Sequence, residues 1–405
     1  MNVKRALFIL LMLVLPWQTR WFSDAGLLAG YPWEQGRISI YAFWLILLVC
    51  ATVSLWQKRV QWRKPQVIEL ILLVAVLVPA LFSGEPRASI AWLISVAFAG
   101  VFVWVIQREQ IRLTDLALWF SISLIPHALL GMFQFAVQFG FDQKWLGLSA
   151  LDPATKGTAV ILNEGVRYLR AYGGFPHPNI FGGYLALALL GMAYFWSTFS
   201  DWVRRFSVYH LPLLAMALAL TASRSAWLVF VFGSIALFVT PSKRSAVEGS
   251  RRLWLAIFLP FVLTLAIFPF LVRPVSAPNQ GAAEAQSVNE RVVALQQVPS
   301  VFARHPFFGT GQGALVPVLI TAGQKPLLAH VVPVMALLEL GLVGFASLLI
   351  ALGRFRWDWR RVSIVSVVIW PLLLLDHYLW SYWSGHILLA IILLFIGLER
   401  RQEIR

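Results

Sequence analysis

Long apolar stretches alternate with short polar segments along almost the whole chain. About twelve of them approach the roughly 20 residues that an α-helix needs to cross the hydrocarbon core of a bilayer. They cover residues 6–19, 38–56, 67–83, 88–106, 115–139, 179–199, 208–222, 225–240, 253–272, 331–352, 362–381 and 385–399. The pattern predicts an all-α polytopic membrane protein with about twelve transmembrane helices, residues 1–405 forming a single integral membrane domain.

The number of spans depends on two places in the chain. Residues 6–17 are short for a span and follow Lys4 and Arg5, as in a signal peptide, but no small-residue cleavage site comes after them. We therefore interpret them as an uncleaved first span. The stretches 208–222 and 225–240 meet at Thr221-Ala222-Ser223-Arg224-Ser225, which predicts either two spans with a tight turn or one broken element.

Composition agrees with a membrane protein and excludes other classes. Hydrophobic residues make up 59% of the chain, charged residues only 13%, and the mean hydropathy is +0.75. The net charge of +15 would suit a nucleic-acid-binding protein, but the basic residues form short clusters between apolar runs and not one soluble face. We therefore expect no nucleic-acid partner. The single cysteine, Cys50, excludes an intrachain disulfide bond.

The basic clusters predict the orientation of the chain. If the spans alternate from a cytoplasmic N-terminus, every inner segment carries at least two Lys or Arg residues, which places both termini in the cytoplasm. Two long loops then lie outside, at 140–178 and 273–330. Within the larger loop, residues 284–302 have helical spacing. One side can be shared by Val288, Val292, Leu295, Val298, Val301 and Phe302, which predicts an amphipathic helix on the outer surface.

Several polar residues that could carry chemistry fall on this predicted outer side. They are Arg167, Arg170, His177, Asn179, Arg224, Arg291 and His330. Charged groups that face lipid are costly, so these side chains should point into a cavity or towards water. Arginine forks bind phosphate oxygens with paired hydrogen bonds, and a histidine can accept a proton near neutral pH. The set indicates a site for a lipid-linked diphosphate.

Structural interpretations of the same residues stay open. Arg20, Arg37 and Arg87 are better explained as side chains that reach to the lipid headgroups. Arg170 and Arg291 could equally form structural pairs, and His330 could simply cap a helix.

The segment that enters the sixth stretch has its own structural alternatives. His177, between two prolines, could stabilise a turn, and Asn179 is a candidate N-cap for the helix that follows.

Three carboxylates lie within apolar stretches, where acidic residues are functional candidates by default. Asp376 is followed by His377 near the outer end of its stretch, so both can belong to the outer site. Glu339 comes nine residues after His330, about half a turn out of phase, and should pair with another helix. Glu69 lies near an inner end and can reach the headgroups.

Four motifs resemble those of the O-antigen ligase/polymerase superfamily of bacterial lipid-linked glycan transferases. They are Arg170-Ala171-Tyr172-Gly173-Gly174-Phe175-Pro176-His177-Pro178-Asn179; Ser223-Arg224-Ser225-Ala226-Trp227; Arg291 with Pro306-Phe307-Phe308-Gly309-Thr310-Gly311-Gln312-Gly313; and Ala329-His330 with Leu338-Glu339-Leu340-Gly341-Leu342-Val343-Gly344. The resemblance covers residues 167–344 in motif and the whole chain in topology.

The resemblance implies a glycosyltransferase with a GT-C-like membrane fold, in which the large extracytoplasmic loop contains short helices. Its donor would be a polyprenyl-diphosphate-linked glycan, and the acceptor hydroxyl would come from a lipid, another glycan or a protein. Arg170, Arg224 and Arg291 would hold the diphosphate, and His330 would position or deprotonate the acceptor. Arg167, His177, Asn179, Asp376 and His377 would assist binding. Transfer would invert the anomeric centre and need neither a metal nor a nucleotide cofactor.

The chain departs from the family pattern in two places. Val331 stands where the family often has Asn after the motif histidine, and the family pattern does not account for residues 376–380.

The rival interpretation is a transporter or flippase of lipid-linked glycans. A transporter should bind its substrate near the membrane midplane between repeated halves, whereas here the candidates lie outside and no repeat is visible.

Overall fold

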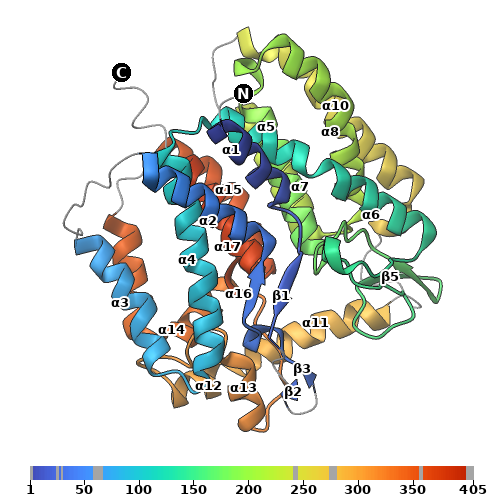
Figure 1. The fold of residues 1–405 in the computed structure, drawn as a ribbon. Helices are drawn as coiled ribbons and strands as arrows, with labels where there is room; N and C mark the ends of the chain where they lie inside the picture. The colour runs from blue at the N-terminus through green and yellow to red at the C-terminus, as the bar shows by residue number, and fades with distance from the viewer. Residues whose placement is uncertain are drawn as a thin grey trace.

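The computed structural model shows a bundle of α-helices with short strands in its connecting segments (Figure 1). It describes residues 3–23, 27–28, 31–57, 67–239, 245–272, 281–354 and 359–397. Part of the predicted orientation rests on Lys58, Arg59, Arg63, Lys64, Lys243, Arg244, Arg356, Arg400, Arg401 and Arg405, which lie outside the described residues.

The α-helices are α1 Val3–Val14, α2 Ala42–Gln57, α3 Val67–Leu81, α4 Pro86–Arg108, α5 Leu113–Ser123, α6 Ile125–Val137, α7 Pro178–Tyr194, α8 Asp201–Leu220, α9 Arg224–Val239, α10 Ser245–Ile267, α11 Gly281–Gln296, α12 Val298–Arg304, α13 Leu315–Thr321, α14 Val332–Arg354, α15 Trp359–Leu375, α16 Tyr378–Ser381 and α17 Trp383–Gly397. The strands are β1 Arg20–Phe22, β2 Leu27–Leu28, β3 Tyr31–Pro32, β4 Ser39–Tyr41, β5 Val160–Asn163 and β6 Val166–Leu169.

A helix occupies most of each of the twelve apolar stretches, which confirms the all-α class. Among the described residues, four helical segments are long and apolar enough to cross a membrane: 86–108, 113–137, 201–220 and 332–353. Shorter apolar helices account for several other stretches. These helices indicate a multi-pass membrane protein, whereas the number of twelve crossings stays a prediction. The junction at 221–223 is resolved as a three-residue turn between two helices, α8 and α9.

Helix α7 lies at the centre of the bundle and carries the site at its first residues. Twelve of its 17 residues are buried, as expected for a helix that is apolar on all sides. Gly182 and Gly183 let its neighbours approach closely: a Cβ atom on Gly183 would lie 2.1 Å from the Tyr378 hydroxyl. These small residues bring α9 and α16 against the start of α7.

The segments predicted as outer loops contain more structure than the sequence suggested. Strands β5 and β6 form an antiparallel hairpin, and its turn residues Glu164 and Gly165 both have positive φ, as a two-residue hairpin turn requires. Figure 1 shows α11, α12 and α13 together at the opposite end of the bundle from α1. These elements are the short helices expected for the 273–330 loop, of which residues 273–280 lie outside the described chain.

The single amphipathic helix predicted at 284–302 is wrong in one respect. The helix is interrupted at Gln297, because Pro299 occupies the first turn of a second helix, α12. Val288, Val292 and Leu295 on α11 are exposed, whereas Val301 on α12 is buried. Only the second part of the predicted apolar face therefore packs against the protein.

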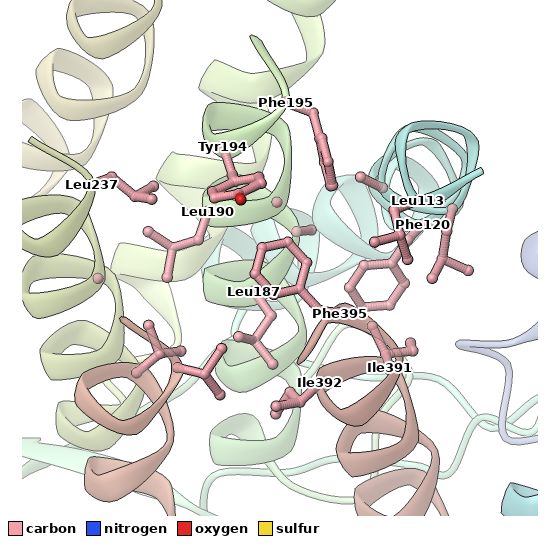
Figure 2. A pocket seen from close by; sticks show the side chains of 17 residues that line it. Leu113, Phe120, Leu187, Leu190, Tyr194, Phe195, Leu237, Ile391, Ile392 and Phe395 are labelled. Carbon is pink, nitrogen blue, oxygen red and sulfur yellow. The ribbon is translucent and has the colours of Figure 1, made fainter. Parts of the chain in front are cut away.

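An apolar pocket opens between α5, α7, α9, α15 and α17, with an empty volume of about 790 Å³ (Figure 2). Leu187, Leu190 and Tyr194 of α7 and Phe395 of α17 line it. The three α7 residues lie in the half of that helix away from His177. The pocket is therefore separate from the candidate functional site at the start of α7.

Helix α14 is kinked at Gly341, and a loop docks into the kink. Gly341 has φ +63° and ψ −175°, which a residue with a side chain rarely adopts. The freed backbone groups pair with the loop: Leu342 N–H donates to the Pro306 carbonyl at 2.8 Å, and Thr310 N–H donates to the Leu338 carbonyl at 2.9 Å. A Cβ atom on Gly341 would lie 2.3 Å from the Gly309 nitrogen.

We therefore expect Gly341→Ala to destabilise the protein by about 1–3 kcal/mol, since both the backbone conformation and the space forbid a side chain. Thermal unfolding of the purified protein in detergent measures the effect. Gly353→Ala is the matched control, because Gly353 lies in the same helix with open space around it. Equal melting temperatures for the two variants would contradict this account of the kink.

Candidate functional site

Arg170 connects three elements where β6 ends. Its Nε donates to the Thr221 carbonyl at the end of α8 at 2.7 Å, and its Nη2 donates to the Asn179 side-chain oxygen at 2.6 Å. The guanidinium is half-buried and therefore held in one orientation. Because the N–H donors of an arginine lie in a rigid planar fork, these two bonds fix the direction in which the whole group faces.

Asn179 and Ser225 bind the buried carboxylate of Asp376 from two helices. The Asn179 amide donates to Asp376 Oδ1 at 2.8 Å, and the Ser225 hydroxyl donates to Oδ2. Asp376 lies between α15 and α16 and is 4% exposed, so these bonds replace the water that a carboxylate needs. They join the start of α7, the start of α9 and the end of α15 at one point.

His177, and not Asn179, caps α7, so the N-cap prediction for Asn179 is wrong. The backbone N–H of Asn179 donates to His177 Nδ1 at 3.1 Å. Pro178 takes the first helical position, which it occupies readily because its missing N–H would have no partner there. The cap therefore moves to residue 177, and the Asn179 side chain is released to bridge Arg170 and Asp376.

Two histidines from distant parts of the chain face each other. The rings of His330 and His377 have their centroids 4.9 Å apart at an edge-on angle. His377 Nδ1 is 2.6 Å from the Ser381 hydroxyl, which fixes the ring at the start of α16. His330 precedes α14, and within the described residues its buried Nδ1 has no hydrogen-bond partner.

Arg291 brings α11 into the same cluster. Its positive charge acts on His177, His330, His377 and Asp376, which places all of these groups within electrostatic range of one guanidinium. Its Nε is buried and has no hydrogen-bond partner among the residues that the structure describes. The predicted loop 273–330 thus contributes a cation to a site otherwise built from helix ends.

The environment keeps the histidines outside the spans neutral. Burial, supported by the positive charge of Arg291, lowers the pKa of His330 to about 4. Burial, followed by the charge of Arg170 and the neighbouring histidines, lowers the pKa of His177 well below its ordinary value. At neutral pH, His330 is therefore an uncharged imidazole that can accept a proton near the permanent cation Arg291.

Two of the predicted site arginines, Arg224 and Arg167, have other surroundings. Arg224 is exposed at the first residue of α9, beside the buried Ser225. Arg167 lies on β6, where its guanidinium donates to the backbone carbonyls of Pro153 and Thr155 in its own loop. The structure thus gathers Arg170, Arg291 and the residues around Asp376 and His330. It exposes Arg224 at the start of α9 and gives Arg167 contacts within its own loop.

A second layer of hydrogen bonds supports His377 and was only partly foreseen. Glu339 accepts a bond from Trp380 Nε1 at 2.7 Å, which confirms that it pairs with another helix. The Trp380 carbonyl in turn meets Trp92 Nε1 and His386 Nε2, each at 2.7 Å. These contacts fix α16, and the sequence carried no signal for them because they join residues far apart in the chain.

The cluster combines two guanidinium groups, one carboxylate and neutral imidazoles around the start of α7. Such a set can hold an anion with two negative charges and accept a proton next to it. Within the described residues, no group of three or more His, Cys, Asp or Glu side chains is arranged to hold a metal ion.

The apolar helices indicate a multi-pass membrane protein, and the cluster brings Arg170, Arg291 and the histidines together around the start of α7. Residues 209–349 match the family model Wzy_C, described as O-Antigen ligase. This match covers about a third of the chain and agrees with the resemblance of its motifs. The matched region includes Arg224, Arg291 and His330. A comparison with curated proteins found no match.

The capping role of His177 leads to a prediction with an internal control. His177→Ala should destabilise the protein by about 0.5–2 kcal/mol, because α7 loses its cap, whereas His177→Asn should keep most of the stability since Asn is a good cap residue. Thermal unfolding in detergent compares the two. If both variants lose the same stability, His177 does not act as the cap of α7.

Proposed function

We propose that this protein is a glycosyltransferase of the O-antigen ligase type. It moves an oligo- or polysaccharide from a polyprenyl-diphosphate carrier to an acceptor hydroxyl at the outer face of the bacterial cytoplasmic membrane. The observation that carries the proposal is the neutral His330 within electrostatic range of Arg291, in a cluster that also contains Arg170. The match of residues 209–349 to the O-antigen ligase family model supports it.

The arginines would bind the diphosphate. The fork of a guanidinium matches two phosphate oxygens, and half-buried cations act strongly on negative charge. Arg170 is oriented by Thr221 and Asn179, and the Nε of Arg291 has a free donor position. As the sugar–phosphate bond breaks, charge on the leaving diphosphate grows, and these two residues would stabilise it. Arg224 would contact the donor from the rim of the site.

His330 would serve as the base. The acceptor oxygen attacks the anomeric carbon, the bond from that carbon to the diphosphate oxygen breaks, and the acceptor proton passes to His330. Attack opposite to the leaving group inverts the anomeric centre. His377, held by Ser381, packs against the His330 ring and would keep it directed at the acceptor. The step needs no metal in this scheme, because the arginines neutralise the diphosphate.

Asp376 would adjust how tightly the two arginines bind the diphosphate. Its carboxylate lies within electrostatic range of Arg170 and Arg291 and offsets part of their charge. Through Asn179 it also holds the Arg170 fork. This offset should favour product release, since two uncompensated half-buried arginines would hold the product diphosphate at least as firmly as the donor.

The proposed orientation has both termini in the cytoplasm and the site outside, as the basic clusters indicate. Ligation of the glycan to a lipid acceptor, as in lipopolysaccharide assembly, is slightly favoured over chain polymerisation. The description of the matched family model supports that preference.

Glycan transfer in proteoliposomes tests the proposal. Purified protein receives an undecaprenyl-diphosphate-linked glycan and candidate acceptors, without nucleotide or added metal. His330→Ala should lower kcat by about 10²–10⁴-fold through loss of the base, and Arg291→Ala by about 10²–10³-fold through loss of charge stabilisation. Arg304→Ala is the matched control, since Arg304 is an exposed arginine of the same loop and should retain wild-type activity.

The outcomes separate an enzyme from a transporter. A new glycosidic bond that depends on His330 supports the proposal. Donor that crosses the bilayer without any new bond, equally in wild type and His330→Ala, would identify a transporter of lipid-linked glycans instead.

The pH dependence of kcat/KM gives an independent prediction about His330. Its pKa is lowered to about 4, so the base stays neutral as pH falls through the usual histidine range, and activity should decline only as pH approaches about 4. Arg291→Gln removes a charge that disfavours protonation, which should move this decline to higher pH. A decline near pH 6.5 that Arg291→Gln does not move would contradict the assignment.

A further inference from the structure

A second pocket, partly polar, lies beside the arginine–histidine cluster and under the segment that connects α1 and α2. Strands β1 and β4 pair in antiparallel fashion, and a short 3₁₀ turn, η1 Glu34–Gly36, lies between them. These elements form one wall, and α4, α16 and the start of α17 form the others. The pocket has an empty volume of about 550 Å³, within the range of small-molecule sites.

The charged wall of the pocket carries two arginines and one carboxylate. Arg20 donates to the Glu34 carboxylate, to the Ser39 hydroxyl at 3.2 Å and to the Tyr41 hydroxyl at 2.9 Å. Arg37 reaches the other oxygen of Glu34 at 3.5 Å. The sequence alone favours lipid headgroups as the contacts of these two side chains. In the structure, both pair with Glu34 in this wall.

Unused donors remain on this wall. Arg37 Nε is buried without a hydrogen-bond partner among the described residues, and the same holds for the indole nitrogen of Trp44, a side chain 3% exposed. With two guanidinium groups against one carboxylate, the pocket has a net positive charge. The side chains of Arg20, Glu34 and Arg37 are 20–36% exposed, so the charged wall is open to solvent.

The opposite walls are aromatic. Trp44, Trp92, Tyr382 and Trp383 line the pocket together with the small residue Ala91. Flat aromatic faces combined with a few directed polar groups suit a ligand with one apolar face and many hydroxyls, since the faces cover the carbon-bound hydrogens while the polar groups bind the edge. A sugar ring has this character.

The pocket shares a wall with the arginine–histidine cluster. Ser381 and Tyr382 line it, and Ser381 is the residue 2.6 Å from His377 Nδ1. The Tyr382 and His377 rings are stacked with centroids 6.2 Å apart, and His377 lies 4.9 Å from His330. A ligand in the pocket is thus separated from the proposed base by two side chains, first Ser381 or Tyr382 and then His377.

We propose that this pocket binds an acidic sugar, one that carries a carboxylate or a phosphate, as part of the acceptor glycan. The anionic group binds Arg37, and the ring packs against the aromatic walls. Its assignment to the acceptor rests on the proposed function, whereas the binding of an acidic sugar does not. The neighbouring residues of the acceptor then extend past Ser381 towards His330.

Saturation-transfer NMR on the detergent-purified protein tests the binding. The probes are cellobiouronic acid, which carries one carboxylate, and uncharged cellobiose. The acidic disaccharide should bind the wild type at least about fivefold more tightly, a difference of about 1 kcal/mol. Arg37→Gln should abolish this preference, and Ala91→Phe, which fills the pocket while keeping its charges, should weaken binding of both sugars.

Two control measurements complete the binding experiment. His330→Ala should bind the acidic disaccharide like wild type, so a failure of the proposed transfer reaction leaves the pocket result unaffected. Thermal unfolding confirms that each variant is folded. Equal binding of the two sugars to wild type, unchanged preference in Arg37→Gln, or displacement of the disaccharide by inorganic phosphate at equal concentration would overturn the proposal.

Discussion

Burying the Asp376 carboxylate among apolar helices costs free energy unless hydrogen bonds replace the water it loses. Asn179 and Ser225 supply those bonds from the first turns of α7 and α9. The same Asn179 accepts from Arg170, which in turn binds the end of α8. One carboxylate thereby fixes where four helix ends meet, and the position of each cation and imidazole in the cluster follows from that meeting point.

The electrostatic consequence is a site that is positive yet contains neutral bases. Arg170 and Arg291 keep their charge in half-buried positions, because a guanidinium stays protonated in proteins. His330, by contrast, loses its proton through burial and the nearby Arg291. An arrangement of this kind separates the two tasks that the proposed reaction needs, since the arginines bind charge and the imidazole accepts a proton. The kink at Gly341 and the bond between Glu339 and Trp380 position the adjoining segments.

The sequence predicted the helices well, because lipid imposes a local rule: an apolar stretch of sufficient length must form a helix. It also named most of the cluster, since Arg170, Arg291, His330 and Asp376 stand out as polar residues beside apolar runs. The connections could not be predicted. Asn179 and Asp376 are 197 positions apart, and only the packing of α7 against the end of α15 brings them together. Arg224 illustrates a second limit of the sequence: its place in a motif does not say whether its side chain is buried, and in the structure it is exposed.

Local signals that compete with each other explain the remaining differences. Pro178 displaced the cap of α7 by two residues, and Pro299 divided the amphipathic helix. Arg20 and Arg37 sit at the edge of apolar stretches, where reaching to headgroups is the ordinary explanation. Their pairing with Glu34 depends on the antiparallel register of β1 and β4.

The most direct test of the central claim is an experimental structure with a polyprenyl-diphosphate-linked sugar bound. The account predicts that diphosphate oxygens lie within hydrogen-bond distance of Arg170 and Arg291, with the anomeric carbon facing His330. A donor whose diphosphate binds away from this cluster, for example near the remote end of α7, would contradict it.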